Sequence, residues 1–290
     1  MSATVRVQPA FDDVDEIRSR IEGWGPFVPL AREAASAEEK AATGAAASSF
    51  VPPWFRRNVV TQGRPHVDGA EAILRNPRFA AAAEEVHGGA VVEPTTVYVN
   101  VMGPAPYPFI AHLDIPVFRC ASRRNAPPWL LHRLHASGLW EDERVRLATA
   151  VSWIHDGPGG DFHYWPDGPD GPSAAEAAPF DNVAIVADNE AVFHGVGPLG
   201  ASDEPSPLDL SLGAELRHDP TTGRWVLDDP GPVITYDRTD VRITISWKAE
   251  VFADRTERDD VRAAADDPLP VDAIIARFVD DLRARGHDVT

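Results

Sequence analysis

The spacing of hydrophobic residues changes near residue 94, from a helical period before it to a strand-like period after it. Before it, apolar positions recur at the period of an amphipathic helix. We therefore expect a mainly helical region at 1–93, with helices at 14–24, 30–48 and 67–86, the last of them interrupted at Pro77.

After residue 94 the chain becomes β-branched and alternating, with turn residues between short apolar runs. The predicted strands cover residues 95–102, 109–118, 147–156, 160–166, 182–188, 191–196, 223–229 and 241–252. Many short strands separated by turns favour a β-sandwich or jelly roll. Residues 271–286 carry apolar side chains on one helical face and predict a final helix.

These elements predict one domain spanning residues 1–290, mainly β with flanking helices (α+β). Its parts are a helical region at 1–93, a jelly-roll core at 94–252 with an insertion at about 197–238, and a C-terminal helix at 253–290. Within the insertion, residues 197–222 are polar and rich in Pro, which is typical of a surface insertion or a lid over an active site.

The composition narrows the chemistry that this fold can carry. Hydrophobic residues make up 43% of the 290 residues, and none of their runs approaches the roughly 20 apolar residues of a membrane span. The first residues are polar and acidic, unlike a signal peptide, so we expect a cytoplasmic protein. The single cysteine, Cys120, excludes an intrachain disulfide and a cysteine-rich metal site. A metal would therefore need histidine and carboxylate ligands.

The chain carries 27 basic and 45 acidic residues, a formal net charge of −18. Such a surface repels phosphate backbones and anionic lipids, so nucleic acid and membranes are poor partners and a small-molecule substrate is favoured. A local basic cluster of Arg119, Arg123 and Arg124 stands out against this acidity. It follows the strand predicted at 109–118, so Arg119 is a candidate contact for an anionic substrate.

Metal-binding chemistry is indicated first by His112-Leu113-Asp114. On a strand, residues two apart point to the same face, so His112 and Asp114 can present an imidazole and a carboxylate side by side. A histidine from a neighbouring strand would complete a facial triad with open coordination positions, as an O₂-activating Fe(II) centre requires. His194, in the apolar segment AVFHGV, is the candidate third ligand.

A carboxylate-binding site is indicated by Arg242, which lies in a mostly apolar strand with Thr244 and Ser246 on the same face. A buried arginine needs an anionic partner, and its planar fork binds carboxylates through two hydrogen bonds. Arg242 is therefore a candidate for the distal carboxylate of 2-oxoglutarate, with Lys248 as the alternative. Tyr98 and Asn100 share a face of an earlier strand and are candidate contacts of the co-substrate; Phe162, Tyr164 and Trp165 are candidate substrate contacts.

In this order the motifs HLD (112–114), GGDFHYWPDG (159–168), FHGV (193–196) and RIT (242–244) resemble the Fe(II)/2-oxoglutarate-dependent dioxygenase superfamily. The resemblance covers roughly residues 94–252. It implies a double-stranded β-helix, with Fe(II) held by His112, Asp114 and His194. It also implies 2-oxoglutarate and O₂ as co-substrates, and hydroxylation of a small molecule with release of succinate and CO₂.

Other interpretations of the same residues stay open. A rival metal site could use His155, His163 and Asp167, whereas His132 and His135 are more typical of an ordinary helix face. A cupin-like metal enzyme would keep the triad without using 2-oxoglutarate. A non-catalytic jelly-roll module that binds a small ligand would need neither metal nor open coordination positions.

Overall fold

A computed structural model describes residues 4–30, 32, 52–123, 125–180, 182–200, 207, 210–231, 233–265 and 269–289. The helix expected at 30–48 lies almost wholly outside these residues, as do Arg124 and part of the segment 197–222.

The described strands form two facing sheets and a small third one, all with antiparallel pairing. The larger sheet has the order β1-β10-β7-β15-β5-β3-β2, with β4 paired to β3. Its strands are β1 (Thr4–Val7), β2 (Val28–Pro29), β3 (Trp54–Thr61), β4 (Arg64–Pro65), β5 (Val91–Met102), β7 (Leu147–Ile154), β10 (Ala184–Ala187) and β15 (Arg242–Phe252).

The smaller sheet has the order β6-β11-β8-β9. Its strands are β6 (Phe109–His112), β8 (Phe162–Trp165), β9 (Ala174–Glu176) and β11 (Phe193–Val196). From β5 to β15 the chain passes back and forth between the two sheets: β5, β7, β10 and β15 belong to the larger one, and β6, β8, β9 and β11 to the smaller. This winding is a double-stranded β-helix, so the predicted jelly-roll fold is confirmed.

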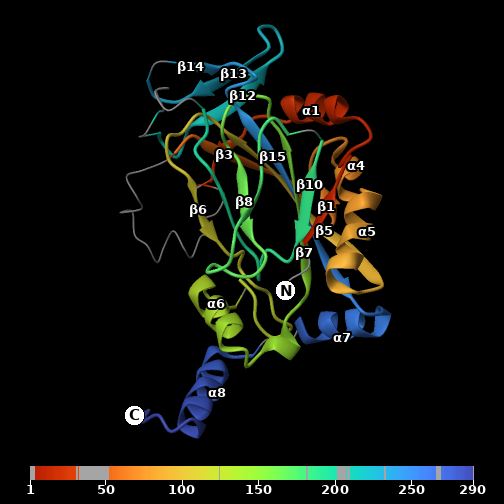
Figure 1. Cartoon of the computed structure of the whole chain (residues 1–290), viewed down its shortest axis with the longest axis vertical. Coiled ribbons are helices and arrows are strands. Elements are labelled where there is room, and N and C mark those ends of the chain that lie inside the picture. The colour runs from red at the N-terminus through yellow and green to blue at the C-terminus, as the bar shows by residue number, and fades with distance from the viewer. Residues whose placement is uncertain are drawn as a thin grey trace.

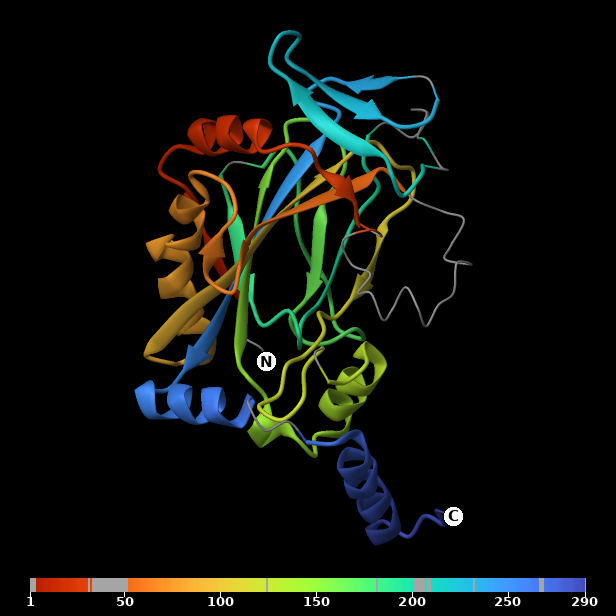
Figure 2. The ribbon, with the colours of Figure 1, turned by 180° about the vertical axis from the view of Figure 1, so that it is seen from behind.

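Helices cover the outer face of the larger sheet and the end of the molecule away from the third sheet, whereas α1 (Val14–Gly23) lies beside the third sheet (Figures 1 and 2). The other described helices are α4 (Ala70–Leu74), α5 (Pro77–His87), α6 (Pro128–Ser137), α7 (Arg255–Ala265) and α8 (Val271–Ala284), with a short 3₁₀ turn at Glu141–Glu143. Pro77 does not kink one helix but begins α5, capped by the Asn76 side chain on the Arg78 amide. None of the described helices is both long and apolar enough to cross a bilayer.

Side chains along β15 point alternately to the two faces of the larger sheet, so one face can pack in the core while the other lines the site. Ile243, Ile245 and Trp247 point outward into the main apolar core. There Trp247 packs near Phe79 of α5, and its indole donates a hydrogen bond to the Leu74 carbonyl of α4. The even-numbered residues, beginning with Arg242 and Thr244, point to the inner face between the two sheets. The strand therefore places polar side chains inside without interrupting the apolar core.

Two sequence-based expectations need correction. The described part of 1–93 is not helical throughout, because β1 and β3 are strands of the larger sheet, and β3 pairs with β5 over most of its length. The strand expected at 109–118 ends at His112, so Asp114 lies in the following loop rather than on a strand.

The insertion between β11 and β15 carries its own sheet, a meander of β12 (Glu215–Asp219), β13 (Arg224–Asp228) and β14 (Ile234–Tyr236). In Figure 1 this meander lies at one end of the jelly roll. Part of the predicted lid, 197–222, is thus strand β12, whose Leu216 bonds reciprocally with Phe27 through their backbones. A closing motion of this segment stays a prediction.

Candidate active site

Strand register brings the predicted metal ligands together. His194 on β11 is directly opposite His112 on β6, and their ring centroids are 4.5 Å apart. Asp114 follows β6 and donates its backbone N–H to the carbonyl of Asn189, just before β11, at 2.8 Å. Gly195 permits this close approach, since a Cβ there would lie 2.9 Å from the Phe109 carbonyl oxygen.

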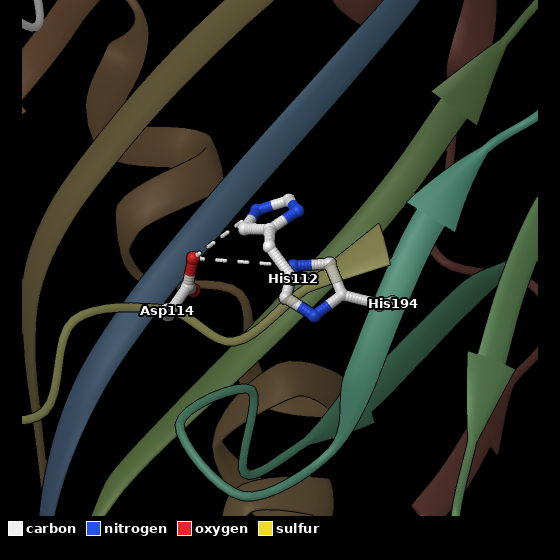
Figure 3. A group of neighbouring side chains, drawn as sticks. All are labelled: His112, Asp114 and His194. Carbon is white, nitrogen blue, oxygen red and sulfur yellow. Dashed lines mark ion pairs between the residues drawn. The ribbon is translucent and has the colours of Figure 1, made fainter. Parts of the chain in front are cut away.

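The three side chains point to a common point (Figure 3). Asp114 Oδ1 is 4.0 Å from His112 Nε2 and 3.9 Å from His194 Nε2. The three ligand atoms all lie within 4.8 Å of one another, and no other group of this kind is found in the described part of the chain. These distances suit three ligands around one ion.

The backbone fixes which ring nitrogens face that point. His112 Nδ1 donates to the Ile110 carbonyl at 2.9 Å, and His194 Nδ1 donates to the Val192 carbonyl at 3.0 Å. With the protons held on Nδ1, both Nε2 atoms present lone pairs to a metal. Burial also lowers the pKa of His194, which favours the neutral imidazole that a metal needs.

Asp114 is held by Lys248, whose ammonium donates to Asp114 Oδ2 at 2.6 Å. Burial opposes ionisation of Asp114, but the charge of Lys248 and, next, of His194 overcome it and lower its pKa to about 2. Burial likewise lowers the pKa of Lys248, and Asp114 reverses this and raises it above the ordinary value. Lys248 therefore occupies one oxygen of the ionised carboxylate and leaves Oδ1 for a metal.

Two neutral imidazoles and one carboxylate form the donor set that divalent iron takes in facial-triad sites. They occupy one side of the ion and leave the side toward the cavity open. His112, Asp114 and His194 fit Fe(II) on both counts.

A cavity of about 100 Å³ lies between the two sheets and opens onto the triad. Besides the ligands, the predicted site residues that line it are Tyr98, Asn100, Phe162, Arg242, Thr244 and Ser246. The register of β5 and β15 explains this gathering, because Tyr98 is opposite Ser246 and Asn100 is opposite Thr244.

Among the described residues, Arg242 is a buried cation that forms no ion pair, and the charge of nearby Asp161 offsets the effect of burial only in part. Its side chain is only 1% exposed, and Nη1 donates to Thr244 Oγ1 at 2.5 Å. Among the residues that the structure describes, its Nε and Nη2 atoms have no hydrogen-bond partner. Burial lowers the pKa of Arg242 to about 9, so it remains a cation at neutral pH. A buried cation whose N–H groups have no partner among the described residues is suited to an anionic ligand.

The Gly-Gly turn before β8 is packed against this arginine. Gly160 has a φ of +74°, and a Cβ there would lie 2.7 Å from Arg242 Cδ. A side chain at residue 160 would both strain the backbone and displace the guanidinium. The turn thus shapes the end of the cavity opposite the metal ligands.

Other candidates lie elsewhere. Arg119 lies 3.5 Å from Glu257 and does not line the cavity. Tyr164 stacks on Phe162 with centroids 5.9 Å apart, but neither it nor Trp165 is among the cavity residues. Their proposed contacts with substrate stay predictions that this placement does not favour.

The rival metal site is not assembled. His155 is buried and bonds through Nδ1 to the Val241 carbonyl at 2.9 Å, and its group with His163 and Asp167 does not form a cluster in the described residues. His132 lies on helix α6, as expected, together with His135.

Sequence reasoning missed the contribution of β3 to the cavity. Trp54 and Arg56 lie on its inner face, and Phe109 of β6 joins them. The available signal was the content of aromatic and β-branched residues in WFRRNVVT (54–61), which is typical of a strand. The helical spacing of the residues before and after this segment favours helix instead.

No family model and no curated protein matches this chain. Solved structures similar to it include a 2OG-Fe(II) oxygenase family oxidoreductase from Burkholderia pseudomallei, at 14% identity over 85% of this chain and 84% of that one, with a TM-score of 0.43. A prolyl hydroxylase from Trichoplax adhaerens, in complex with a hypoxia inducible factor peptide fragment, is 10% identical over 91% and 87%, with a TM-score of 0.45. HygX from Streptomyces hygroscopicus, with nickel and 2-oxoglutarate bound, is 8% identical over 86% and 83%, with a TM-score of 0.43.

Proposed function

We propose that the protein is an Fe(II)- and 2-oxoglutarate-dependent oxygenase that hydroxylates a small-molecule substrate. The observation that carries this proposal is the pairing of two features in one cavity. One is a His112–Asp114–His194 triad that is open on one side, and the other is the buried guanidinium of Arg242, which forms no ion pair among the described residues. A metal site needs the first, and a co-substrate with a carboxylate at its far end would explain the second.

Each end of 2-oxoglutarate has a suitable receptor in this arrangement. Arg242 offers two unpaired N–H donors to the distal carboxylate, and Thr244 holds the guanidinium in place through Nη1. Ser246, Asn100 and Tyr98 add polar groups along the same inner face. The open side of the triad would accept the 2-oxo acid end.

Fe(II) bound by the triad would supply O₂ activation, coupled to conversion of 2-oxoglutarate into succinate and CO₂. The contribution of the chain is to bind, orient and shield. Lys248 keeps Asp114 ionised and directs its Oδ1 to the metal position. The apolar walls formed by Val151, Trp153 and Phe162 exclude water from the space between the co-substrate site and the triad.

Anaerobic titration of the protein with Fe(II) and 2-oxoglutarate tests the proposal. A weak visible charge-transfer band is expected only when both bind one centre, and exposure to O₂ should then yield succinate. The band should be absent from His194→Ala. In Arg242→Gln it should need much more 2-oxoglutarate.

The alternatives give other results. A cupin-like enzyme would bind Fe(II) but show neither the band nor loss of 2-oxoglutarate in O₂. A non-catalytic module would bind neither. Either result would overturn the proposed function.

A further inference from the structure

The cavity contains a second arginine whose role the co-substrate does not explain. Arg56 lies on β3 opposite Asn100 of β5, which is itself opposite Thr244 of β15. Arg56 and Thr244 thus occupy one row across the inner face, next to the row that carries Arg242. Both arginines line the same cavity from different strands.

The guanidinium of Arg56 is held in one orientation. Its Nε donates to Asn100 Oδ1 at 2.8 Å, and its central carbon lies 4.0 Å from the centre of the Tyr98 ring. These contacts occupy the Nε–H group and one face of the guanidinium plane. Within the described residues, Arg56 forms no ion pair with a carboxylate, and its terminal nitrogens make no hydrogen bond. A pre-oriented fork of this kind matches the oxygens of a carboxylate or phosphate.

The charges around the cavity leave Arg56 uncompensated even with co-substrates bound. Asp114 is the one acidic residue among the described lining residues, and it is paired with Lys248. The charges of Fe(II) and of doubly ionised 2-oxoglutarate cancel each other. Among the lining residues the two arginines therefore remain as excess positive charge, which Asp161 near Arg242 offsets only in part, in a chain whose net charge is −18. A further anion would offset this excess, whereas a cationic substrate would add to it.

An aromatic wall connects Arg56 with the metal ligands. Trp54, two residues before Arg56 on the same face, lies 4.9 Å from Phe109 between ring centroids. Phe109 in turn lies 5.0 Å from the ring of His112. A ligand held at Arg56 would lie along this wall, with its body directed toward the triad.

We infer that the substrate carries an oxyanion group, a carboxylate or a phosphate, that Arg56 binds, and an apolar or aromatic body that packs on Trp54 and Phe109. The inference rests on the proposed function for the reaction, but the binding step can be measured separately. The residue that we expect to bind the anion is therefore Arg56, which lines the cavity, and not Arg119, which does not.

Binding of three matched probes tests this inference. The protein is loaded with Mn(II) in place of Fe(II) and saturated with 2-oxoglutarate, then titrated calorimetrically with phenylacetate, phenyl phosphate and neutral phenylacetamide. We expect at least one anion to bind on the order of tenfold to a hundredfold more tightly than the amide, as for a charge-assisted hydrogen bond. Comparison of phenylacetate with phenyl phosphate identifies the preferred oxyanion.

Variants connect that preference with Arg56. Arg56→Gln should remove it while leaving affinity for 2-oxoglutarate unchanged, and Arg56→Lys should retain part of it because the charge remains. Arg57→Gln is the matched control. It removes the same charge from the next residue of β3, whose guanidinium bonds to the Pro26 carbonyl, and it should keep the wild-type preference.

Four results would overturn the inference: equal binding of the anions and the amide, no anion binding in the millimolar range, a preference that survives Arg56→Gln, or displacement of the anion by 2-oxoglutarate. The last would place the probe at Arg242. A loss of 2-oxoglutarate affinity in Arg56→Gln would instead assign Arg56 to the co-substrate. If the wild type binds no 2-oxoglutarate, the proposed function fails, while titration of the Mn(II)-loaded protein alone still measures the preference at Arg56.

Discussion

The two ends of the cavity differ in how their charges are compensated. At the metal end, Asp114 is paired with Lys248, and both histidines donate Nδ1 to backbone carbonyls. At the other end, Arg242 is almost fully buried, yet within the described residues two of its nitrogens have no partner. The chain itself completes the first end. At the second end, the described residues leave N–H donors free for an anionic ligand.

This difference shows that the fold itself stabilises the metal ligands, whereas the binding of an anionic ligand would stabilise Arg242. Partners within the chain hold the metal ligands in their binding geometry before any ion arrives, which reduces the cost of ordering them. A buried arginine without a counter-ion destabilises the free protein, and an incoming carboxylate relieves that cost. Substitutions at the two ends should therefore have opposite effects on stability without ligand.

The largest effect is expected from removing a direct metal ligand. Loss of a residue that only supports a ligand typically lowers metal affinity about 10–100-fold, so His112→Ala and His194→Ala should each lower it more than about 100-fold. Calorimetric titration with Mn(II) measures the affinity, and circular dichroism checks the fold. His163→Ala, on the neighbouring strand β8, is the control and should bind metal normally. Normal metal affinity in either ligand variant would contradict the assigned triad.

The next largest effect is expected at the other end of the cavity. Loss of a desolvated charge pair costs about 2–5 kcal/mol, so Arg242→Ala should weaken 2-oxoglutarate binding roughly 30-fold to several thousand-fold. Metal affinity should stay nearly intact, and Arg242→Lys should restore part of the binding. A 2-oxoglutarate titration followed by succinate release provides the measurement.

Lys248→Ala is measured beside it, because Lys248 was the alternative anchor. If only the Lys248 variant lost affinity for the co-substrate, Arg242 would be the wrong choice. Loss in neither variant would favour a cupin-like enzyme.

A smaller effect is expected from removing the ammonium group of Lys248, which pairs with Asp114 at the metal end. Lys248→Met leaves Asp114 partly buried without its partner, and should lower metal affinity about 10–100-fold. The same change should lower the free energy of unfolding by about 1.5–3 kcal/mol, the contribution of a hydrogen bond to a charged group. Metal titration and urea unfolding measure the two quantities. Lys248→Arg, which keeps the charge, should lose less of both; equal losses would show that the charge of Lys248 is unimportant.

An effect that begins at zero is expected from removing the buried cation, and its sign is opposite. Replacing even a buried ion pair with apolar residues of similar volume is often neutral or stabilising by about 1–4 kcal/mol, and an unpaired buried cation lacks the attraction that offsets its desolvation. Without 2-oxoglutarate, Arg242→Met should therefore unfold at the same urea concentration as the wild type or a higher one. Adding 2-oxoglutarate should stabilise the wild type alone. A clear loss of stability in the ligand-free variant would show that Arg242 is already compensated within the chain.

The pH dependence of that stability difference has a defined direction. Burial lowers the pKa of Arg242 to about 9 in the folded protein, whereas an unfolded arginine keeps its ordinary, higher value. Between these values the unfolded chain binds one more proton, so the free energy of unfolding of the wild type rises with pH. The difference in free energy of unfolding between Arg242→Met and the wild type should thus become smaller as pH rises above about 9. Below that pH, Arg242 should leave the difference constant.

Sequence patterns were sufficient for much of the fold and for the residues of the triad. The alternation in residues 241–252 predicted β15 and grouped Arg242, Thr244 and Ser246 on one face, and the structure places all three at the cavity. The predicted strand near 95–102 is part of β5. These predictions succeeded because a strand repeats every two residues, so a local pattern specifies which side chains share a face.

The same local reasoning failed where neighbours in space decide the outcome. Residues 54–61 form a strand because the edge of β5 offers them a partner, while nearby helical patterns suggested otherwise. Lys248 could be placed on the inner face from sequence, but whether it bound co-substrate or Asp114 depended on a contact between residues 134 positions apart. Arg119 lay close to the metal motif in sequence, yet it lies near Glu257.

By itself, therefore, the sequence determined the kind of chemistry available to this protein and the face of each strand that could carry it. Residue types limit a metal to histidine and carboxylate ligands, and strand periodicity orients those residues. The tertiary structure alone decided which faces meet: it set His194 against His112, joined Lys248 to Asp114, and brought Arg56 into the cavity of Arg242. The physical reason is that strand order and register depend on the packing of the whole core, whereas periodicity depends only on neighbouring residues.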